Sequence, residues 1–208
     1  MAWKLIKVFT LATIVAVCVR FFFIEDFRVV SDSMTPSLLP GDLVFISKSA
    51  YSLYIPFSNY EWFHVRRPKA FEIAAFNLPA SNPDSFVKRV VALAGDRVEI
   101  RKGILKINGM AATYAPIKNG YAANAFLENW GQKSYPILWT PEKIPDYGPV
   151  DVPTNHFFAL GDNRNNSLDS RSWGPVPYTC LKGKVGLVWA SLDERGGFRP
   201  KRTGTWIQ

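Results

Sequence analysis

Two residues in this sequence are candidates for nucleophilic catalysis: Ser33, in a Pro-rich stretch at residues 31–42, and Lys88, in an apolar run. A serine hydroxyl is a weak nucleophile at neutral pH, so it needs a base that takes its proton and donors that hold the oxyanion. The hydroxyl of Ser31 and the backbone N–H of Ser33 are suitable donors. The alternative interpretation is that these serines only form turns.

Lys88 lies in residues 86–93, whose alternating pattern predicts a β-strand with Lys88 and Arg89 on opposite faces. Only the lysine can act as a base, because a guanidinium does not lose its proton in a protein. Burial among apolar groups lowers the pKa of a lysine by disfavouring its charged form, which makes a neutral amine available near neutral pH. The alternative is a surface lysine on an edge strand.

A third polar segment, residues 161–171, reads Gly-Asp-Asn-Arg-Asn-Asn-Ser-Leu-Asp-Ser-Arg and follows an apolar run that predicts a strand at residues 156–160. Asp169 and Arg171 stand two residues apart. We expect them to form a supporting salt bridge and not to react. Taken alone, the segment is typical of a polar, Asn-rich loop.

Together these segments resemble a known family. The sequence Ser-Met-Thr-Pro-Ser-Leu at residues 33–38, followed by Gly41 and Asp42, resembles the nucleophile box of the type I signal peptidases, which are membrane-bound serine proteases with a Ser-Lys dyad. Residues 88–96, the hairpin that follows and residues 161–171 agree with the family in order and character. The resemblance extends over residues 20–50, 70–109 and 152–193.

The resemblance implies an integral membrane serine endopeptidase that removes signal peptides from exported preproteins after small residues, as at Ala-x-Ala sites. Ser33 would attack the scissile carbonyl, Lys88 would take the proton and return it to the leaving amine, and Ser167 would hydrogen-bond the lysine. Ser31 and the Ser33 amide would hold the oxyanion. The resemblance also assigns shallow substrate pockets to Val29, Val30, Met34, Leu38, Phe86 and Val87. It implies no metal and no other cofactor.

The sequence departs from the family pattern at three places. Residues 68–76 replace a common Arg-Gly-Asp followed by β-branched residues, which weakens the local preference for a strand. Val30 stands where a proline is often found. Asp32 stands where different branches have glycine or aspartate. These departures concern one turn and the contribution of Ser31, not the dyad.

The N-terminal residues 5–24 are apolar except for Lys7 and Arg20, and about 20 such residues are enough for a helix to cross a bilayer. A cleavable signal sequence is the competing interpretation, but no A-x-A-like site follows the apolar run. We therefore predict one retained transmembrane helix. The flanking charges slightly favour a cytoplasmic N-terminus. The resemblance places the catalytic domain on the periplasmic or extracytoplasmic side of the cell membrane.

The composition predicts a mainly β chain. Its 208 residues allow a sizeable core, and 15 prolines with 14 glycines indicate short strands joined by turns. Strands are expected at residues 43–47, 71–76, 86–93, 156–160 and 185–191, and a hairpin at residues 97–101 and 104–107. The aromatic run at residues 51–63 either rests on a lipid interface or closes the core.

The expected domain organisation combines the resemblance with these patterns. It consists of a membrane anchor at residues 1–27, a signal-peptidase-like catalytic β domain at residues 28–109 and 152–195, a small accessory β-rich insertion at residues 110–151, and a basic tail at residues 196–208.

Charge and cysteine content exclude several function classes. The formal charge of +8 fits an anionic phospholipid surface, and the basic residues form no nucleic-acid module, so no nucleic-acid partner is expected. A disulfide between Cys18 and Cys180 is not expected, because Cys18 lies in the predicted transmembrane helix and Cys180 in the C-terminal part of the chain. The two cysteines and two histidines are not clustered in the chain, which argues against a structural zinc site. We expect a monomer whose partners are preproteins and the membrane.

Other functions fit the sequence less well than the peptidase. A Ser-His-Asp hydrolase would need a G-x-S-x-G elbow, which is missing, and His64 and His156 belong to no motif. The pilin-processing peptidases of conjugation systems and the self-cleaving SOS-type repressors share the dyad, but residues 161–171 argue against both. An inactive membrane-anchored binding module is the alternative outside enzymes, and the presence of both Ser33 and Lys88 argues against it.

Overall fold

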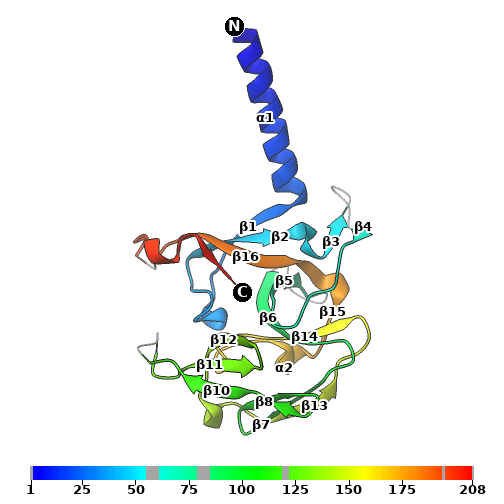
Figure 1. Ribbon diagram of the computed structural model, residues 1–208, viewed down its shortest axis with the longest axis vertical. Helices are drawn as coiled ribbons and strands as arrows, with labels where there is room; N and C mark the ends of the chain where they lie inside the picture. Colours follow the sequence, from blue (N-terminus) through cyan, green and yellow to red (C-terminus); the bar gives the residue numbers. More distant parts are fainter. Residues whose placement is uncertain (1, 55–60, 79–84, 119–121, 194, 208) are drawn as a thin grey trace.

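The computed structural model describes residues 2–54, 61–78, 85–118, 122–193 and 195–207. A helix, α1 (Ala2–Phe22), extends away from a body made of β-sheets (Figure 1). Within the described residues the largest sheet has eight antiparallel strands. Its order is β1 (Ile24–Arg28), β2 (Asp42–Ser47), β16 (Leu181–Ser191), β5 (Ile73–Asn77), β6 (Ser85–Leu93), β14 (His156–Leu160) and β15 (Val176–Pro177), with β17 (Thr205–Trp206) paired to β16.

Three smaller sheets complete the described part of the chain. One contains β13 (Tyr147–Asp151), β7 (Arg97–Arg101), β8 (Ile104–Ile107) and β9 (Met110–Ala111), and another contains β10 (Thr113–Pro116), β11 (Ala125–Trp130) and β12 (Lys133–Leu138). Both lie at the end of the body opposite α1 (Figure 1). The third pairs β3 (Ser52–Tyr54) with β4 (Glu61–His64). The short helices are α2 (Ser170–Trp173) and the 3-10 turns η1 (Asp32–Met34), η2 (Lys48–Ala50), η3 (Pro141–Lys143), η4 (Tyr178–Cys180) and η5 (Pro200–Arg202).

The hydrophobic core anchors the loop that carries Ser33. Met34 and Leu38 are buried against β2 and β16, where they join Val44 and Val188 in one apolar cluster. Because a buried Leu or Met stabilises a fold by about 1.5–3 kcal/mol relative to an exposed one, Met34 fixes the end of the turn η1 and Leu38 fixes the loop that follows it. The loop is therefore held by packing as well as by its prolines.

The predicted mainly β fold is confirmed. The hairpin at residues 97–107 and the strand at 156–160 have the expected bounds, while β16 begins four residues before the expected position 185. The strand expected at residues 71–76 begins instead at Ile73, because Phe71 has φ +72° and belongs to a turn. Residues 110–151 showed no clear period, yet they contribute β9 to β13.

The N-terminal segment contains a helix, as expected, but it ends at Phe22 and not at residue 24, because Ile24 already pairs with Ser47 in the main sheet. Over the described part of the chain, no helix has both the length and the apolar character required for a membrane span.

The aromatic run at residues 51–63 divides between two environments. Tyr51 is buried and contacts Glu72 at 3.3 Å, whereas Trp62 and Phe63 are exposed. Phe57 and Tyr60 lie outside the described residues. The first residue of the run is therefore part of the core, and its last two aromatic side chains are exposed on the surface.

The basic tail returns to the main sheet. Arg202 donates to both carboxylate oxygens of the fully buried Asp42, with Nη2 at 2.5 Å from Oδ2, and also to the carbonyl of Ser37 at 3.0 Å. Ser191 donates to the same carboxylate at 2.6 Å. The tail thus holds the downstream end of the loop that carries Ser33.

Replacing Arg202 by methionine is expected to lower the free energy of unfolding by about 1.5–3 kcal/mol, because the buried Asp42 loses a charged hydrogen-bond donor. Lys201→Met is the matched control, since Lys201 is exposed in the same turn η5. Its effect should stay within about 0.5 kcal/mol. Urea denaturation of the three proteins measures the difference. Equal free energies for both variants would show that Arg202 does not stabilise the loop.

Candidate functional site

The structure brings Ser33 and Lys88 together. Ser33 lies in the turn η1 and Lys88 in the middle of β6, and the lysine Nζ is 2.5 Å from the serine Oγ. The two residues are only 7% and 4% exposed. Lys88 reaches the turn η1, whereas Arg89, the next residue along β6, reaches Asp162 and the Ser37 hydroxyl. A buried amine in contact with a buried hydroxyl can accept its proton.

Burial lowers the pKa of Lys88 from 10.5 to about 8. The carboxylates of Asp169 and Asp162 oppose this shift because they favour the ammonium form. With a pKa of about 8, roughly one Lys88 side chain in ten is neutral at pH 7. The fold therefore supplies an amine that can accept a proton at moderately alkaline pH.

Ser31 and the amide of Ser33 lie next to each other, but they do not both face open space. The Ser31 Oγ accepts a hydrogen bond from the Ser33 backbone N–H at 3.1 Å and thereby caps η1. The Ser31 side chain is itself exposed. A rotation about its χ1 would free the amide and redirect the hydroxyl, so two donors are available at this turn after one side-chain movement.

The polar segment at residues 161–171 supports the turn that carries Ser33. The Asn163 backbone N–H donates to the Ser33 carbonyl at 3.0 Å. The side chains of Asn163 and Asn166 donate to the backbone and side chain of Asp32, at 3.3 and 2.9 Å. This segment, which we call the support loop, fixes the backbone on both sides of the Ser33 side chain.

The expected salt bridge between Asp169 and Arg171 is present, at 2.8 Å. Burial disfavours ionisation of Asp169, but the Arg171 guanidinium keeps the pKa of that carboxyl below its usual value. Asp169 also accepts from the Gly161 N–H at 3.0 Å, and Arg171 donates to the Arg164 carbonyl at 2.7 Å. The pair therefore closes the support loop on itself.

Ser167 lies beside the dyad without a hydrogen bond to Lys88. Its Oγ is buried and has no hydrogen-bond partner among the described residues. A Cβ added to Gly161 would lie 2.1 Å from this oxygen and 2.5 Å from the Ser33 carbonyl oxygen. Only glycine fits at that position. The structure thus places Ser167 near Ser33. The Lys88 amine is hydrogen-bonded to Ser33 but not to Ser167.

A groove of about 490 Å³ opens beside Ser33 and Lys88. Five of the six residues expected to bind substrate line it, namely Val29, Val30, Met34, Phe86 and Val87. The expectation for Leu38 is wrong, because its side chain is fully buried in the core cluster under η1. Sequence reasoning missed other lining residues: Phe27, Arg28, Ser85, Asn166 and Leu168. Their positions next to the motif residues in the chain are the signal that would have found them.

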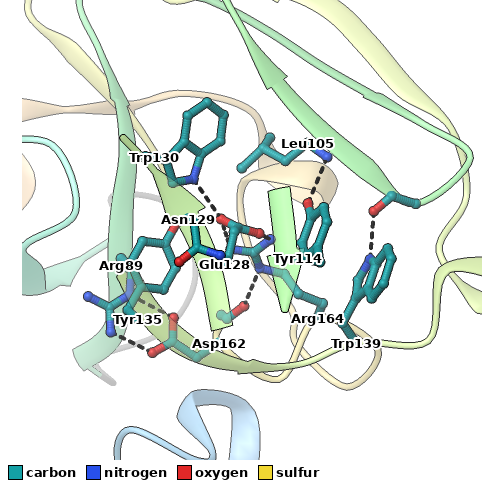
Figure 2. Close-up of polar contacts among 12 residues, drawn as sticks. Arg89, Leu105, Tyr114, Glu128, Asn129, Trp130, Tyr135, Trp139, Asp162 and Arg164 are labelled. Atoms are coloured by element: carbon teal, nitrogen blue, oxygen red, sulfur yellow. Dashed lines mark hydrogen bonds and ion pairs between the residues drawn. The ribbon is translucent and has the colours of Figure 1, made fainter. Parts of the chain in front are cut away.

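Arg89 was not assigned a role from the sequence, yet its side chain is almost fully buried beside the site. Its guanidinium forms an ion pair with Asp162 at 2.7 Å, with both side chains at most 1% exposed. It also donates to the Phe71 carbonyl at 2.7 Å and lies 4.1 Å from the centre of the Tyr135 ring. Figure 2 shows this ion pair beside a second one, between Glu128 and Arg164. Both pairs connect β-strands to the support loop.

Both histidines lie at a separate cavity of about 300 Å³. His64 and His156 line it together with Tyr51 and Tyr178, and none of its lining residues borders the groove at Ser33. Among the described residues there is no group of three or more His, Cys, Asp or Glu side chains arranged to hold a metal ion. Cys180 is free.

A family model described as signal peptidase, peptidase S26, matches residues 2–190. The signal peptidase I of Buchnera aphidicola subsp. Baizongia pistaciae is 31% identical, over 90% of this chain and 76% of the relative. The probable signal peptidase I-2 of Synechocystis sp. is 34% identical, over 86% of this chain and 69% of the relative. A crystal structure of a signal peptidase I from Enterococcus faecalis V583 is 26% identical and covers 58% of this chain and 97% of that chain, with a TM-score of 0.38.

Proposed function

Because this chain belongs to the peptidase S26 family of signal peptidases, and is thus a serine endopeptidase that removes signal peptides from preproteins, we propose that Ser33 and Lys88 are its catalytic dyad. The observation that carries this proposal is the 2.5 Å contact between the Lys88 amine and the Ser33 hydroxyl, both buried. The lowered pKa of Lys88 supports it, because a base must be neutral to accept a proton.

The reaction proceeds in two halves. The neutral Lys88 amine takes the proton of Ser33, whose Oγ attacks the scissile carbonyl to form a tetrahedral intermediate. The Lys88 ammonium then donates this proton to the leaving amine, which leaves an ester between Ser33 and the signal peptide. In the second half the neutral amine takes a proton from water, the hydroxide attacks the ester, and the proton returns to Ser33.

The proposed oxyanion donors are the Ser31 hydroxyl and the Ser33 amide. Replacing Ser31 by alanine should lower kcat by about 100-fold, as the loss of one oxyanion donor does in other serine proteases. Ser31→Thr is the matched control, because it keeps a hydroxyl at the same atom and should retain most of the rate. Initial rates of preprotein cleavage test both variants. If Ser31→Ala cleaves as fast as the unaltered protein, backbone amides alone hold the oxyanion.

The rate should depend on pH through Lys88. Below its pKa of about 8 the amine is protonated and cannot accept the Ser33 proton, so kcat/KM should rise with pH and reach half of its plateau near pH 8. The measurement is kcat/KM between pH 5 and pH 10 in buffers of constant ionic strength. A half-maximum near pH 6, or no dependence, would assign the base to a different group.

The proposed substrate site is the groove beside the dyad. Val29, Met34, Phe86 and Val87 give it apolar walls close to Ser33, which fits small apolar side chains before the cut. The test uses detergent-solubilised protein and two preproteins that differ only at the residue before the cleavage site, alanine or tryptophan. Only the alanine form should be cut at that bond. Equal cleavage of both would contradict the proposed selection of Ala-x-Ala sites.

We further propose that α1 anchors the enzyme to the membrane, with the N-terminus in the cytoplasm, the catalytic part on the extracytoplasmic side, and one chain as the active unit. The helix presents large exposed apolar side chains that have no partner in the β body, among them Trp3, Leu5, Ile6, Phe9, Leu11 and Ile14. It also extends away from that body (Figure 1). Burial of such side chains in lipid would be favourable.

A further inference from the structure

A buried carboxylate in the sheet β10–β11–β12 faces the support loop. Glu128 on β11 is 0% exposed, and its two oxygens accept from both terminal nitrogens of Arg164, with Nη2 at 2.9 Å from Oε1 (Figure 2). Trp130 and Tyr135 donate to the same carboxylate at 3.0 and 2.5 Å. Together these contacts hold the Glu128 carboxylate against the Arg164 guanidinium.

Arg164 in turn holds the first residues of the support loop. Its Nε donates to the Gly161 carbonyl at 3.2 Å. Its backbone N–H donates to the Leu138 carbonyl at 3.0 Å, and the Leu138 N–H donates to the Asp162 carbonyl at 2.9 Å. The loop thus begins as a short parallel bridge to the end of β12. Its backbone position depends on this sheet.

Two routes connect Glu128 to the two residues of the proposed dyad. Asn163, which precedes Arg164, donates its backbone N–H to the Ser33 carbonyl at 3.0 Å. On β6, Arg89 follows Lys88 directly, and its guanidinium stacks over the ring of Tyr135, whose hydroxyl donates to Glu128. Glu128 is therefore connected to the backbone of Ser33 through Arg164 and Asn163, and to the residue after Lys88 through Tyr135.

A buried ion pair is a poor device for stability, because the cost of desolvating two charges offsets most of their attraction, and apolar pairs of similar volume often serve as well. Its geometry, by contrast, is strict, since a bidentate guanidinium and carboxylate fix distance and direction together. The pair between Glu128 and Arg164 is thus better suited to placing the support loop than to stabilising the fold.

We propose that Glu128 is a positioning residue for catalysis: through Arg164 it holds residues 161–163 in the place from which they fix Ser33 opposite Lys88. The inference rests on the proposed dyad. It assigns a role in the reaction to a strand of the region expected to be an accessory insertion.

The first test is Glu128→Gln, compared with Glu128→Asp. The Gln variant should lower kcat by about 100-fold, the effect of a displacement near 1 Å, with KM unchanged. The Asp variant keeps the charge and should recover most of the rate. Ile107→Ala is the control for a loss of stability alone, because Ile107 is buried in the sheet β13–β7–β8–β9, which contains neither dyad residue and no residue of the support loop. It should lower the melting temperature and leave kcat unchanged.

The pH profile separates displacement from a simple change of charge. The charged groups with the largest effects on the pKa of Lys88 are Asp169, Asp162, Arg171 and Asp32. If the support loop moves and water reaches Lys88, the pKa of the lysine rises, and the half-maximum of kcat/KM moves to higher pH in Glu128→Gln. Loss of a negative charge by itself would move it the other way.

Glu128→Gln leaves a buried cation and so risks misfolding. The double variant Glu128→Leu with Arg164→Met removes both charges and should fold, with kcat still about 100-fold lower. The proposed dyad fails if Ser33→Ala cleaves the preprotein as fast as the unaltered protein. If cleavage needs Ser33, but the folded double variant keeps both kcat and the pH half-maximum, Glu128 has no positioning role.

Discussion

Replacement of Lys88 by methionine is expected to abolish preprotein cleavage, with a loss of at least about 10⁴-fold at every pH, because Lys88 is the proposed base and its amine is hydrogen-bonded to the Ser33 hydroxyl. Methionine fills a similar volume and leaves no buried charge. Ser33→Ala should lose as much, and the variant with both changes should lose no more than either, because the two residues act as one unit. Initial rates with the alanine-site preprotein measure all three.

Two further variants separate the basicity of Lys88 from its charge. Lys88→Arg should be as inactive as Lys88→Met, because a guanidinium does not give up its proton near neutral pH. Lys184→Met removes a half-exposed lysine that pairs with Glu72 at 3.3 Å on the same sheet, and it should keep full activity. Substantial cleavage by Lys88→Met, above the rate of Ser33→Ala, would remove Lys88 from the dyad.

The neighbouring residue, Arg89, should have its largest effect on stability. Arg89→Met leaves the carboxylate of Asp162, which is 0% exposed, without its cation, so the free energy of unfolding should fall by about 3–5 kcal/mol. The change also removes the donor to the Phe71 carbonyl. Adjacent basic residues on β6 thus have opposite requirements, since one must become neutral and the other must stay charged.

Arg97→Met is the control for Arg89→Met. Arg97 on β7 pairs with Asp151 on β13 at 3.0 Å, but both side chains are more than half exposed. The free energy of unfolding should therefore fall by at most about 1 kcal/mol. The double change Arg89→Met with Asp162→Leu removes both buried charges and should regain much of the stability. Urea denaturation compares the variants. Equal losses for Arg89→Met and Arg97→Met would mean that burial adds nothing to this pair.

The parts of the fold that follow from neighbouring residues were predictable. The hairpin at residues 97–107 has alternating apolar residues and a turn at Lys102 and Gly103, both with positive φ. The contact of Ser33 with Lys88 joins residues 55 positions apart, and it was expected only from the resemblance to a family with a Ser-Lys dyad. The hairpin needed no knowledge of how distant segments pack, whereas the expected contact of Ser33 with Lys88 needed the family pattern.

The features that depend on distant segments were not predictable. Glu128 and Arg164 are 36 residues apart, and neither alternation nor spacing indicates that they meet. Leu38 lies in an irregular loop, where no period says which side chains point inward, so its assignment to the groove was wrong. Arg202 looked like one charge of a solvated tail, but it lies against Asp42 from the other end of the chain.

The position of the two histidines has a consequence for chemical modification. His64 and His156 lie at the separate cavity and not at the groove, so acylation confined to the two imidazoles should leave turnover intact. The one amine with a depressed pKa is instead the preferred target among the lysines of the described chain for a small electrophile that enters the groove at pH 8. Covalent inactivation should therefore follow carbamylation of Lys88, and a bound substrate should protect against it.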